Sequence, residues 1–350
     1  YVGFKKFENL YNSILEQNTY FILKTRIEHI DKIFLNLNII FNLIIYYFKN
    51  KNIKTAYLIS LILEIDPKIV ITNIDNSIDF SLVAKKLHKK IKFLAIQNAA
   101  RYQFDEPFYD KSQNEKFFIP ELACFGEYEK SLYQKHKIDV KKFLVVGSLV
   151  MAEYINQKKV KTENNKYDIC LILEESTGWN NLYSGFEEAL GKIAFFVTKF
   201  AEENSLELII ASKRKTKNLI DQEKKFYSNF INPDYVTVQK SNFSSYYAME
   251  NSKVTIGMFS TILREGLALD KKILSCNFTG CQAWDFPIKG ICFLEENDYK
   301  SFSERLTKIL NLNFDNYKKL INFPPSYIMS LDKKNLADQK IKNIINLAIK

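Results

Sequence analysis

The chain has 350 residues, of which 47% are hydrophobic and 26% are charged, and its formal net charge is +10. The length suits two folded domains, and the recurrence of apolar residues throughout excludes a disordered chain. With only 10 Gly, 7 Pro and 5 Cys, collagen-like and disulfide-scaffold proteins are excluded too. The positive charge comes mostly from lysine. It reflects either compositional drift or a working positive field that attracts phosphorylated substrates, anionic lipid head groups or nucleic acid.

The cysteine and histidine residues predict neither a metal centre nor a disulfide framework. No Cys-x-x-Cys pair occurs, and the three histidines are scattered. We therefore expect a reducing, cytoplasmic compartment, with no metal and no cofactor. The longest apolar run, residues 39–48, is too short to span a membrane.

In the first part of the chain, apolar β-branched runs alternate with amphipathic stretches, which is the pattern of a parallel sheet covered by helices. Residues 1–36 are harder to place, and Tyr20–Leu23 are a candidate strand within them. We expect helices at residues 37–49, 54–65, 77–87 and 127–136. Strands are predicted at Lys68–Thr72, Ile91–Ile96, Phe117–Phe125 with an interruption at Pro120, and Phe143–Val146.

The polar stretch 156–166 lacks periodicity and is the predicted linker. After it the same alternation restarts, and the tail at 298–350 is predicted to form helices interrupted at Pro324 and Pro325. The predicted strands are Asp168–Leu173, Leu206–Ala211, Tyr235–Gln239, Val254–Met258, Lys272–Cys276 and Gly290–Leu294. The predicted helices between them are 184–204, 218–230, 243–251 and 261–269.

These elements predict an α/β protein with two Rossmann-like domains, a cleft between them and a helical C-terminal tail. We place an N-terminal domain at 1–155, the linker at 156–166 and a C-terminal domain at 167–330. A final helix, at 331–350, is placed against the N-terminal domain.

The most informative segment, residues 251–278, joins a buried strand to a helix. Ser260 and Thr261 lie where N-cap residues belong, and Arg264 and Glu265 fall in the first turn. Backbone N–H groups and the helix dipole there favour an anion, and hydroxyl groups can hydrogen-bond a phosphate. An ordinary helix cap is the alternative interpretation.

Two more clusters follow strands of the second domain. Lys213 and Arg214 can hold a diphosphate or a sugar carboxylate, or they form a solvated loop. Ser176 and Thr177 let the backbone approach a phosphate, although the acidic residues before them, Glu174 and Glu175, oppose that role. Neither a Walker motif nor GxGxxG occurs, which argues against P-loop NTPases and dinucleotide dehydrogenases.

Polar residues also follow two strands of the first domain, and we expect them at the carboxyl edge of its sheet. Asp75 and Asn76 follow the first strand, and Asn98 and Arg101 follow the second. Asp75 is a candidate general base or nucleophile, and equally a candidate cap for the next helix. Glu127 is the second candidate carboxylate, or a first-turn acid that interacts with the helix dipole.

Four segments together resemble bacterial surface-carbohydrate (capsule and lipopolysaccharide) biosynthesis proteins: DPKIVITNIDN (66–76), KFLAIQNAAR (92–101), FLVVGS (143–148) and SKVTIGMFSTILREGLALDKKILSCNF (252–278). The resemblance covers most of residues 54–295 and implies a glycosyltransferase of the GT-B type, similar in architecture to the β-Kdo transferases. The chain is more distantly similar to glycerophosphotransferases and to non-hydrolysing nucleotide-sugar 2-epimerases.

The resemblance implies a nucleotide-sugar donor in the C-terminal domain and the acceptor in the N-terminal domain. The candidate donor-binding residues are Ser176, Thr177, Lys213, Arg214, Ser260, Thr261, Arg264 and Glu265. The candidate acceptor-side residues are Asn76, Asn98 and Arg101, and the candidate catalytic carboxylates are Asp75 and Glu127. Ala99 stands where related sequences have Gly, and EESTGW (174–179) replaces the expected Gly-rich donor loop. These departures leave a changed specificity or an inactive homologue open.

The predicted function is transfer of a sugar, with a CMP-linked acidic sugar such as Kdo as one version of the donor, to a surface-glycan or lipid-linked acceptor. A nucleotide-sugar 2-epimerase, a glycerophosphotransferase and a non-catalytic basic module at a membrane surface are the alternatives. We expect a cytoplasmic protein that is peripheral at the anionic inner face of the cytoplasmic membrane. We expect no nucleic-acid partner, because no basic stripe with interleaved aromatic residues is present.

Overall fold

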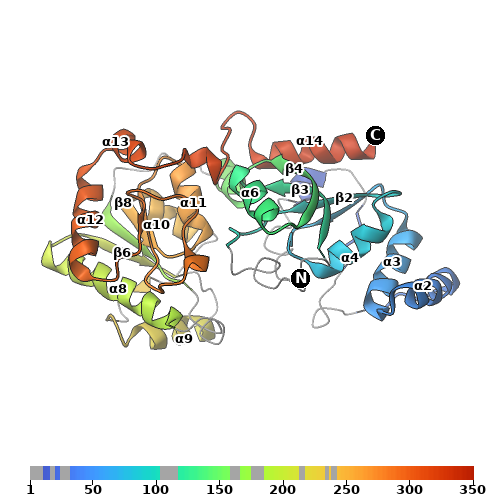
Figure 1. Cartoon of the computed structure of the whole chain (residues 1–350), viewed down its shortest axis with the longest axis horizontal. Coiled ribbons are helices and arrows are strands. Elements are labelled where there is room, and N and C mark those ends of the chain that lie inside the picture. The colour runs from blue at the N-terminus through green and yellow to red at the C-terminus, as the bar shows by residue number, and fades with distance from the viewer. Residues whose placement is uncertain are drawn as a thin grey trace. The chain divides into compact units, whose positions relative to one another are not determined.

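The structure is a computed structural model, and it describes residues 11–15, 20–23, 32–102, 117–157, 166–174, 185–212, 217–232, 236–237 and 243–350. The chain divides into two compact units (Figure 1). The N-terminal unit comprises Tyr1–Asn98, Asp105–Glu153 and Asp332–Lys350, and the C-terminal unit comprises Ala99–Phe104 and Tyr154–Leu331. Each unit holds a parallel sheet with helices packed on it, which confirms the predicted α/β class with two Rossmann-like domains and a C-terminal helix.

The N-terminal unit is built on four parallel strands in the order β1-β2-β3-β4. The side chains of successive residues point to opposite faces of the sheet, so both faces need a cover. The strands are β1 (Ile69–Thr72), β2 (Lys92–Ile96), β3 (Phe118–Cys124) and β4 (Asp139–Val145).

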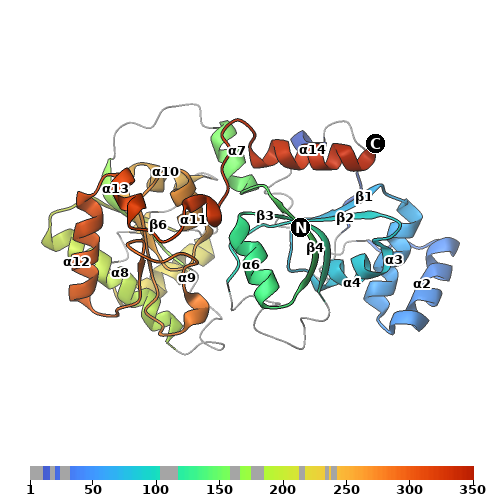
Figure 2. The same cartoon turned by 45° about the horizontal axis from the view of Figure 1, so that its top comes forward.

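Two groups of helices cover the faces of this sheet. Phe93 and Ala95 share a core with α3, α4 and α6, whereas Leu94 and Ile96 share a core with α7 and α14. Figure 2 shows α14, from the end of the chain, running along this second face. The helices of the unit are α2 (Leu37–Asn50), α3 (Ile53–Ile65), α4 (Ile78–Leu87), α6 (Glu127–Lys135), α14 (Ala337–Ile349) and the first part of α7 (Leu149–Gln157). From Tyr154 onward, α7 belongs to the C-terminal unit.

Two sequence predictions for this unit were wrong, and the first two residues of the predicted linker are helical. β3 continues through Pro120 without an interruption. Its pairing with β2 begins only at Glu121, and its register with β4 skips the proline. Pro120 therefore does not have to donate a hydrogen bond to a neighbouring strand. Tyr20–Leu23 form no strand. The predicted linker starts inside a helix, since α7 extends to Gln157; residues 158–165 lie outside the described part of the chain.

The C-terminal unit has six parallel strands in the order β10-β9-β8-β5-β6-β7. From β5 the chain builds outward in one direction through β6 and β7, and then returns to place β8 on the other side of β5. The strands are β5 (Tyr167–Ile172), β6 (Leu208–Ala211), β7 (Val236–Thr237), β8 (Ser252–Gly257), β9 (Ile273–Cys276) and β10 (Phe293–Leu294).

Four helices of the C-terminal unit contact each other in two pairs. α8 and α12 contact each other through Phe196 and Phe302, while α10 and α11 meet where Met249 lies against Gly266. The tail is helical as predicted, and Pro325 begins the short helix η4. The helices are α8 (Phe186–Glu203), α9 (Lys217–Tyr227), α10 (Ser244–Glu250), α11 (Thr261–Ala268), η3 (Gln282–Trp284), α12 (Tyr299–Asn311), α13 (Phe314–Lys319) and η4 (Pro325–Tyr327).

Candidate functional site

The strand order of the C-terminal sheet reverses between β5 and β8, which are hydrogen-bonded neighbours. In open parallel sheets, ligands bind outside the carboxyl ends of the strands at such a reversal, because the loops that follow the two strands diverge there. Leu173 and Glu174 follow β5, and the segment 258–260 follows β8. This edge is therefore the candidate ligand site of the unit.

Ser260 occupies the N-cap of α11 at this edge. Its backbone is extended (φ −62°, ψ 140°), as a cap requires, yet its side chain makes no capping hydrogen bond. The residue is only 9% exposed. Ser260 is therefore the N-cap of α11 by its backbone alone, and its hydroxyl lies at the positive end of a helix dipole.

Thr261 and Arg264, the next two candidate donor residues, bind the backbone of the chain itself. The Ala100 N–H donates to Thr261 Oγ1 at 2.9 Å, and Arg264 Nη2 donates to the Arg101 carbonyl at 2.6 Å. The Arg264 guanidinium also lies 4.8 Å from the centre of the Tyr102 ring, a cation–π contact. Both side chains thus attach residues 100–102 to the C-terminal unit.

Arg264 is completely buried, with 0% exposure, and Glu265 beside it is also buried. A buried guanidinium must be hydrogen-bonded to offset its lost hydration, which the Arg101 carbonyl and the Tyr102 ring help to do. Arg101 is itself buried and belongs to the C-terminal unit, although the sequence places it in the N-terminal domain. The ligand roles of Arg101, Arg264 and Glu265 stay predictions.

A buried polar cluster that the sequence analysis did not select lies after β5 and β6. The Tyr227 hydroxyl donates to the Glu174 carbonyl and accepts from the Glu174 N–H, both at 3.3 Å, and the Ser212 hydroxyl donates to a carboxylate oxygen of Glu223. All four residues are buried. Burial raises the pKa of Tyr227, and the negative charges of Glu174 and Glu223 raise it further, so this phenol stays a neutral donor.

A sequence signal for this cluster exists in α9. Ile220, Glu223 and Tyr227 are its buried residues and follow the spacing of a helix face. An acid in such an apolar stripe is unusual enough to mark a buried site. The predicted donor residues Ser176, Thr177, Lys213 and Arg214 lie outside the described residues.

In the N-terminal unit, the two candidate carboxylates differ in access. Asp75 is fully buried and its Oδ2 accepts a hydrogen bond from the Tyr133 hydroxyl at 3.1 Å, whereas Glu127, the first residue of α6, is exposed. Asp75 does not cap α4, because Ser77 is its N-cap and accepts from the Phe80 N–H at 3.3 Å. The capping interpretation of Asp75 is therefore wrong.

The carboxyl ends of β2 and β3 are joined by a buried network. The Gln97 amide donates to Glu129 Oε1 at 3.1 Å and accepts from the Phe125 N–H at 2.8 Å. Burial raises the pKa of the Cys124 thiol, and the charges of Glu129, Glu127 and Asp75 raise it further. Asp75 accepts a hydrogen bond from Tyr133 of α6, the helix that begins at Glu127, so the structure links both predicted carboxylates to one helix.

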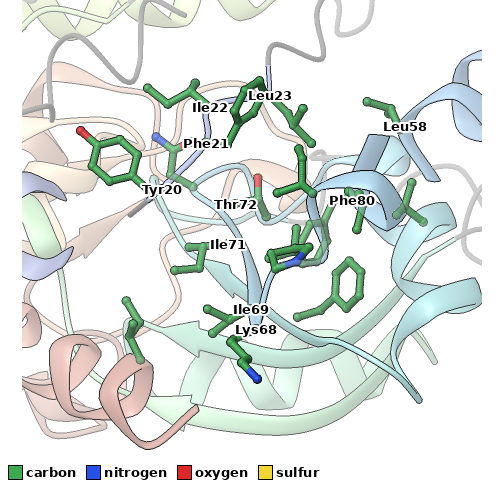
Figure 3. A pocket seen from close by; sticks show the side chains of 18 of the residues that line it. Tyr20, Phe21, Ile22, Leu23, Leu58, Lys68, Ile69, Ile71, Thr72 and Phe80 are labelled. Atoms are coloured by element: carbon green, nitrogen blue, oxygen red, sulfur yellow. The ribbon is translucent and has the colours of Figure 1, made fainter. Parts of the chain in front are cut away.

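The two candidate amides of this edge are accessible: Asn76 is half-buried and Asn98 is exposed. An apolar cavity of about 650 Å³ lies in the same unit, next to β1 (Figure 3). Its walls are mainly aliphatic and aromatic, and its polar lining includes Thr72, Asn73 and Ser77 at the carboxyl end of β1. Residues 20–23, which do not form the expected strand, line one side of this cavity, with Ile345 and Ile349 of α14 also in its wall.

The described part of the chain contains no helix long and apolar enough to cross a membrane. No curated protein matches the chain in sequence.

Solved structures share its fold. The UDP-GlcNAc 2-epimerase of Methanocaldococcus jannaschii, in complex with UDP-GlcNAc and UDP, has a TM-score of 0.51 at 14% identity over 84% of this chain and 80% of that one. S. aureus MnaA with UDP has a TM-score of 0.52 at 10% identity, over 85% of this chain and 79% of that one. This likeness agrees with the GT-B fold expected from the sequence.

A protein family described as "putative O-antigen biosynthesis protein" matches residues 133–346 of the chain. The match spans more than half of the sequence and includes all six strands of the C-terminal sheet. It also covers the strand reversal between β5 and β8 and the whole of α11. The chain therefore belongs to this O-antigen biosynthesis family, as its resemblance to surface-carbohydrate biosynthesis proteins implies.

Proposed function

We propose that the chain is a glycosyltransferase that binds a nucleotide sugar at the strand reversal of its C-terminal sheet and transfers the sugar to a surface-glycan or lipid-linked acceptor. The observation that carries the proposal is Ser260, a buried hydroxyl at the N-terminus of α11 that makes no capping hydrogen bond. A hydroxyl and backbone N–H groups at the positive end of a helix suit the diphosphate or monophosphate of a donor.

The buried acids on the other side of the reversal complement a phosphate-binding helix. Glu174 lies two residues after the end of β5, and carboxylates accept hydrogen bonds from the hydroxyl groups of a ribose or a sugar. Tyr227 is held neutral and keeps Glu174 in place through two backbone hydrogen bonds. The donor's phosphate would then lie towards Ser260 and its hydroxyl groups towards Glu174.

The acceptor side of the proposal rests on the N-terminal unit. Asp75 or Glu127 would remove the proton from the acceptor hydroxyl as it attacks the sugar, and Asn76 and Asn98 would hydrogen-bond the acceptor. The apolar cavity beside β1 has the volume and lining that a hydrocarbon chain requires. A lipid-linked acceptor at the inner face of the cytoplasmic membrane would therefore fit.

Nucleotide-sugar 2-epimerisation is the second candidate, and the likeness to two structures, one a UDP-GlcNAc 2-epimerase and the other a UDP complex, supports it. Epimerisation needs no acceptor, so the two reactions differ in their products when the donor alone is supplied. Conversion of the sugar without acceptor would favour the epimerase, and release of the sugar only with acceptor would favour the transferase.

A thermal-shift measurement with CMP, UDP, GDP and CDP tests the donor site. A nucleotide at about 100 times its Kd adds about 2.7 kcal/mol to the free energy of unfolding, and we expect one base to raise the Tm clearly more than the others. A CMP-selective shift would support the acidic-sugar donor. No shift with any nucleotide would support the non-catalytic membrane module instead.

Ser260→Ala should weaken the binding of the stabilising nucleotide by about 10- to 150-fold, since a hydrogen bond to a charged group contributes about 1.5–3 kcal/mol. Ser301→Ala is the matched control, because Ser301 lies in the first turn of α12 in the same unit and bonds Asp298 through its backbone N–H. Equal Kd values for the two variants would remove Ser260 from the donor site.

A further inference from the structure

The helix α2 has an apolar outer face. It packs against α3 through the side that carries Ile39, and in both views it lies beyond α3 as seen from the sheet (Figures 1 and 2). A surface helix normally presents polar residues on the side away from its packing partner. In α2 that side is apolar, and we call it the α2 apolar face: Leu37, Ile40, Phe41, Ile44, Tyr47 and Phe48.

The exposure of this face is large. Leu37 is 86% exposed, Phe41 65% and Phe48 76%. These residues and Ile44 follow a spacing of four, three and four, which aligns them along one line of the helix. Contiguous apolar surface of this kind marks a contact with a membrane or a partner, because its exposure to water is unfavourable in free energy.

The charge around the α2 apolar face is positive. No Asp or Glu occurs from Lys32 to Leu63, whereas lysines occur at 32, 49, 51 and 54. Lys54 forms an ion pair with Asp79 at 2.7 Å, but Lys32, Lys49 and Lys51 form none with the described residues. Apolar residues flanked by exposed lysines complement a lipid surface whose head groups carry negative charge.

The dimensions decide how such a helix meets a bilayer. Its 14 residues span about 21 Å at 1.5 Å per residue, less than the roughly 30 Å of a hydrocarbon core. A helix of this length with aromatic residues on its apolar side lies in the plane of the interface.

We propose that α2 docks the N-terminal unit on an anionic membrane surface. The α2 apolar face enters the boundary between head groups and acyl chains, and Lys32, Lys49 and Lys51 contact lipid phosphates. This membrane docking specifies the membrane partner of the proposed function. Its biological role rests on the proposed function. The physical contact itself depends only on α2.

Vesicle co-sedimentation of the full chain tests the proposal, with phosphatidylcholine vesicles that contain about one-third phosphatidylglycerol. We expect binding to these vesicles that weakens at high salt, because screening reduces the lysine contribution. The triple variant Phe41→Ser, Ile44→Ser, Phe48→Ser should lose at least about a hundredfold in partition coefficient, since each buried apolar side chain contributes about a factor of ten.

The matched control variant is Phe195→Ser, Leu320→Ser, Leu347→Ser, which replaces three exposed apolar residues outside α2 and should bind the vesicles like the unmodified chain. Phe41→Trp gives a second readout, because its fluorescence should shift to the blue on vesicle binding. An unchanged partition coefficient for the α2 variant, or no blue shift, would overturn the proposal.

A second copy of the chain is the competing occupant of the α2 apolar face. Sedimentation of the protein without lipid as a dimer that the α2 variant converts to a monomer would overturn membrane docking in favour of self-association. The nucleotide thermal shift of the α2 variant separates this test from the proposed function: it should equal that of the unmodified chain, which also shows that the variant is folded.

Discussion

Arg264 illustrates what burial does to a charged residue. Its place in the first turn of a helix after a buried strand predicts a phosphate ligand, but in the structure its guanidinium binds the Arg101 carbonyl and the Tyr102 ring. Arg101 and Tyr102 are distant from Arg264 in sequence, so no local pattern reveals this contact. The same local pattern does place Ser260 correctly at the N-cap, because a cap depends only on its immediate neighbours.

The two candidate carboxylates of the N-terminal unit permit a prediction about single residues. We expect Glu127→Gln to lower kcat by about 10²- to 10⁴-fold, the contribution of a general base, because Glu127 is the candidate carboxylate that is exposed to solvent. Asp75→Asn should have a smaller effect, since Asp75 is buried and the amide oxygen can still accept from Tyr133.

The measurement is the transfer rate at saturating donor, with the nucleotide thermal shift as the control for donor binding. A loss for Asp75→Asn that equals or exceeds the loss for Glu127→Gln would identify Asp75 as the reacting carboxylate instead.

At the scale of elements, the strand predicted at Gly290–Leu294 is mostly not a strand. Only Phe293–Leu294 pair with β9, and Gly290 instead forms an isolated antiparallel bridge with Ile321. The apolar composition of residues 290–294 is typical of a strand. Their pairing with β9 is limited because the Ile291 N–H donates instead to the Leu320 carbonyl of the C-terminal tail, at 3.0 Å.

Gly290→Ala tests this contact. The φ of Gly290 is +100°, and an added Cβ would lie 2.2 Å from the Leu320 carbonyl oxygen. We expect the free energy of unfolding, measured by chemical denaturation, to fall by about 3 kcal/mol or more, because backbone strain and a steric collision add.

Gly280→Ala is the matched control. Gly280 also has a positive φ, +70°, but an added Cβ there meets nothing within 4 Å, so only the strain of about 1 kcal/mol should remain. Equal losses for the two variants would show that the Leu320 collision relaxes at no cost.

At the scale of the whole molecule, the end of the chain completes the core of the N-terminal unit. Ala337, Ile341 and Ile345 of α14 are buried with Leu94 and Ile96 of β2. The amphipathic pattern of α14 predicts a helix with one apolar face. The sequence predicts that this helix lies against the N-terminal domain, but the amphipathic pattern alone does not identify the sheet that receives its apolar face, which is set by the tertiary contacts.

Ile341→Ala should therefore destabilise the N-terminal unit by about 2–5 kcal/mol, the usual cost of such a core truncation. Hydrogen exchange followed by peptide should show lost protection in β1 and β2 and unchanged protection in β5 and β8. Leu347→Ala is the control, because Leu347 is exposed on the same helix. An equal loss of protection in both sheets would show that the two units unfold as one.

The sequence by itself determined the fold class, most strand and helix positions and the start of α11. Each of these depends on local periodicity, on capping and on the alternation of strand with helix. These patterns can be recognised in short stretches of the sequence. It also selected the carboxyl edges of both sheets as sites, because strand direction follows from the order of elements.

Only the tertiary structure decided which side chains remain accessible at those edges. It buried Asp75 and Arg264, assembled Glu174, Glu223 and Tyr227 after two strands, and left the outer face of α2 in contact with solvent. Burial and exposure depend on residues far apart in the chain, and no local pattern contains that information.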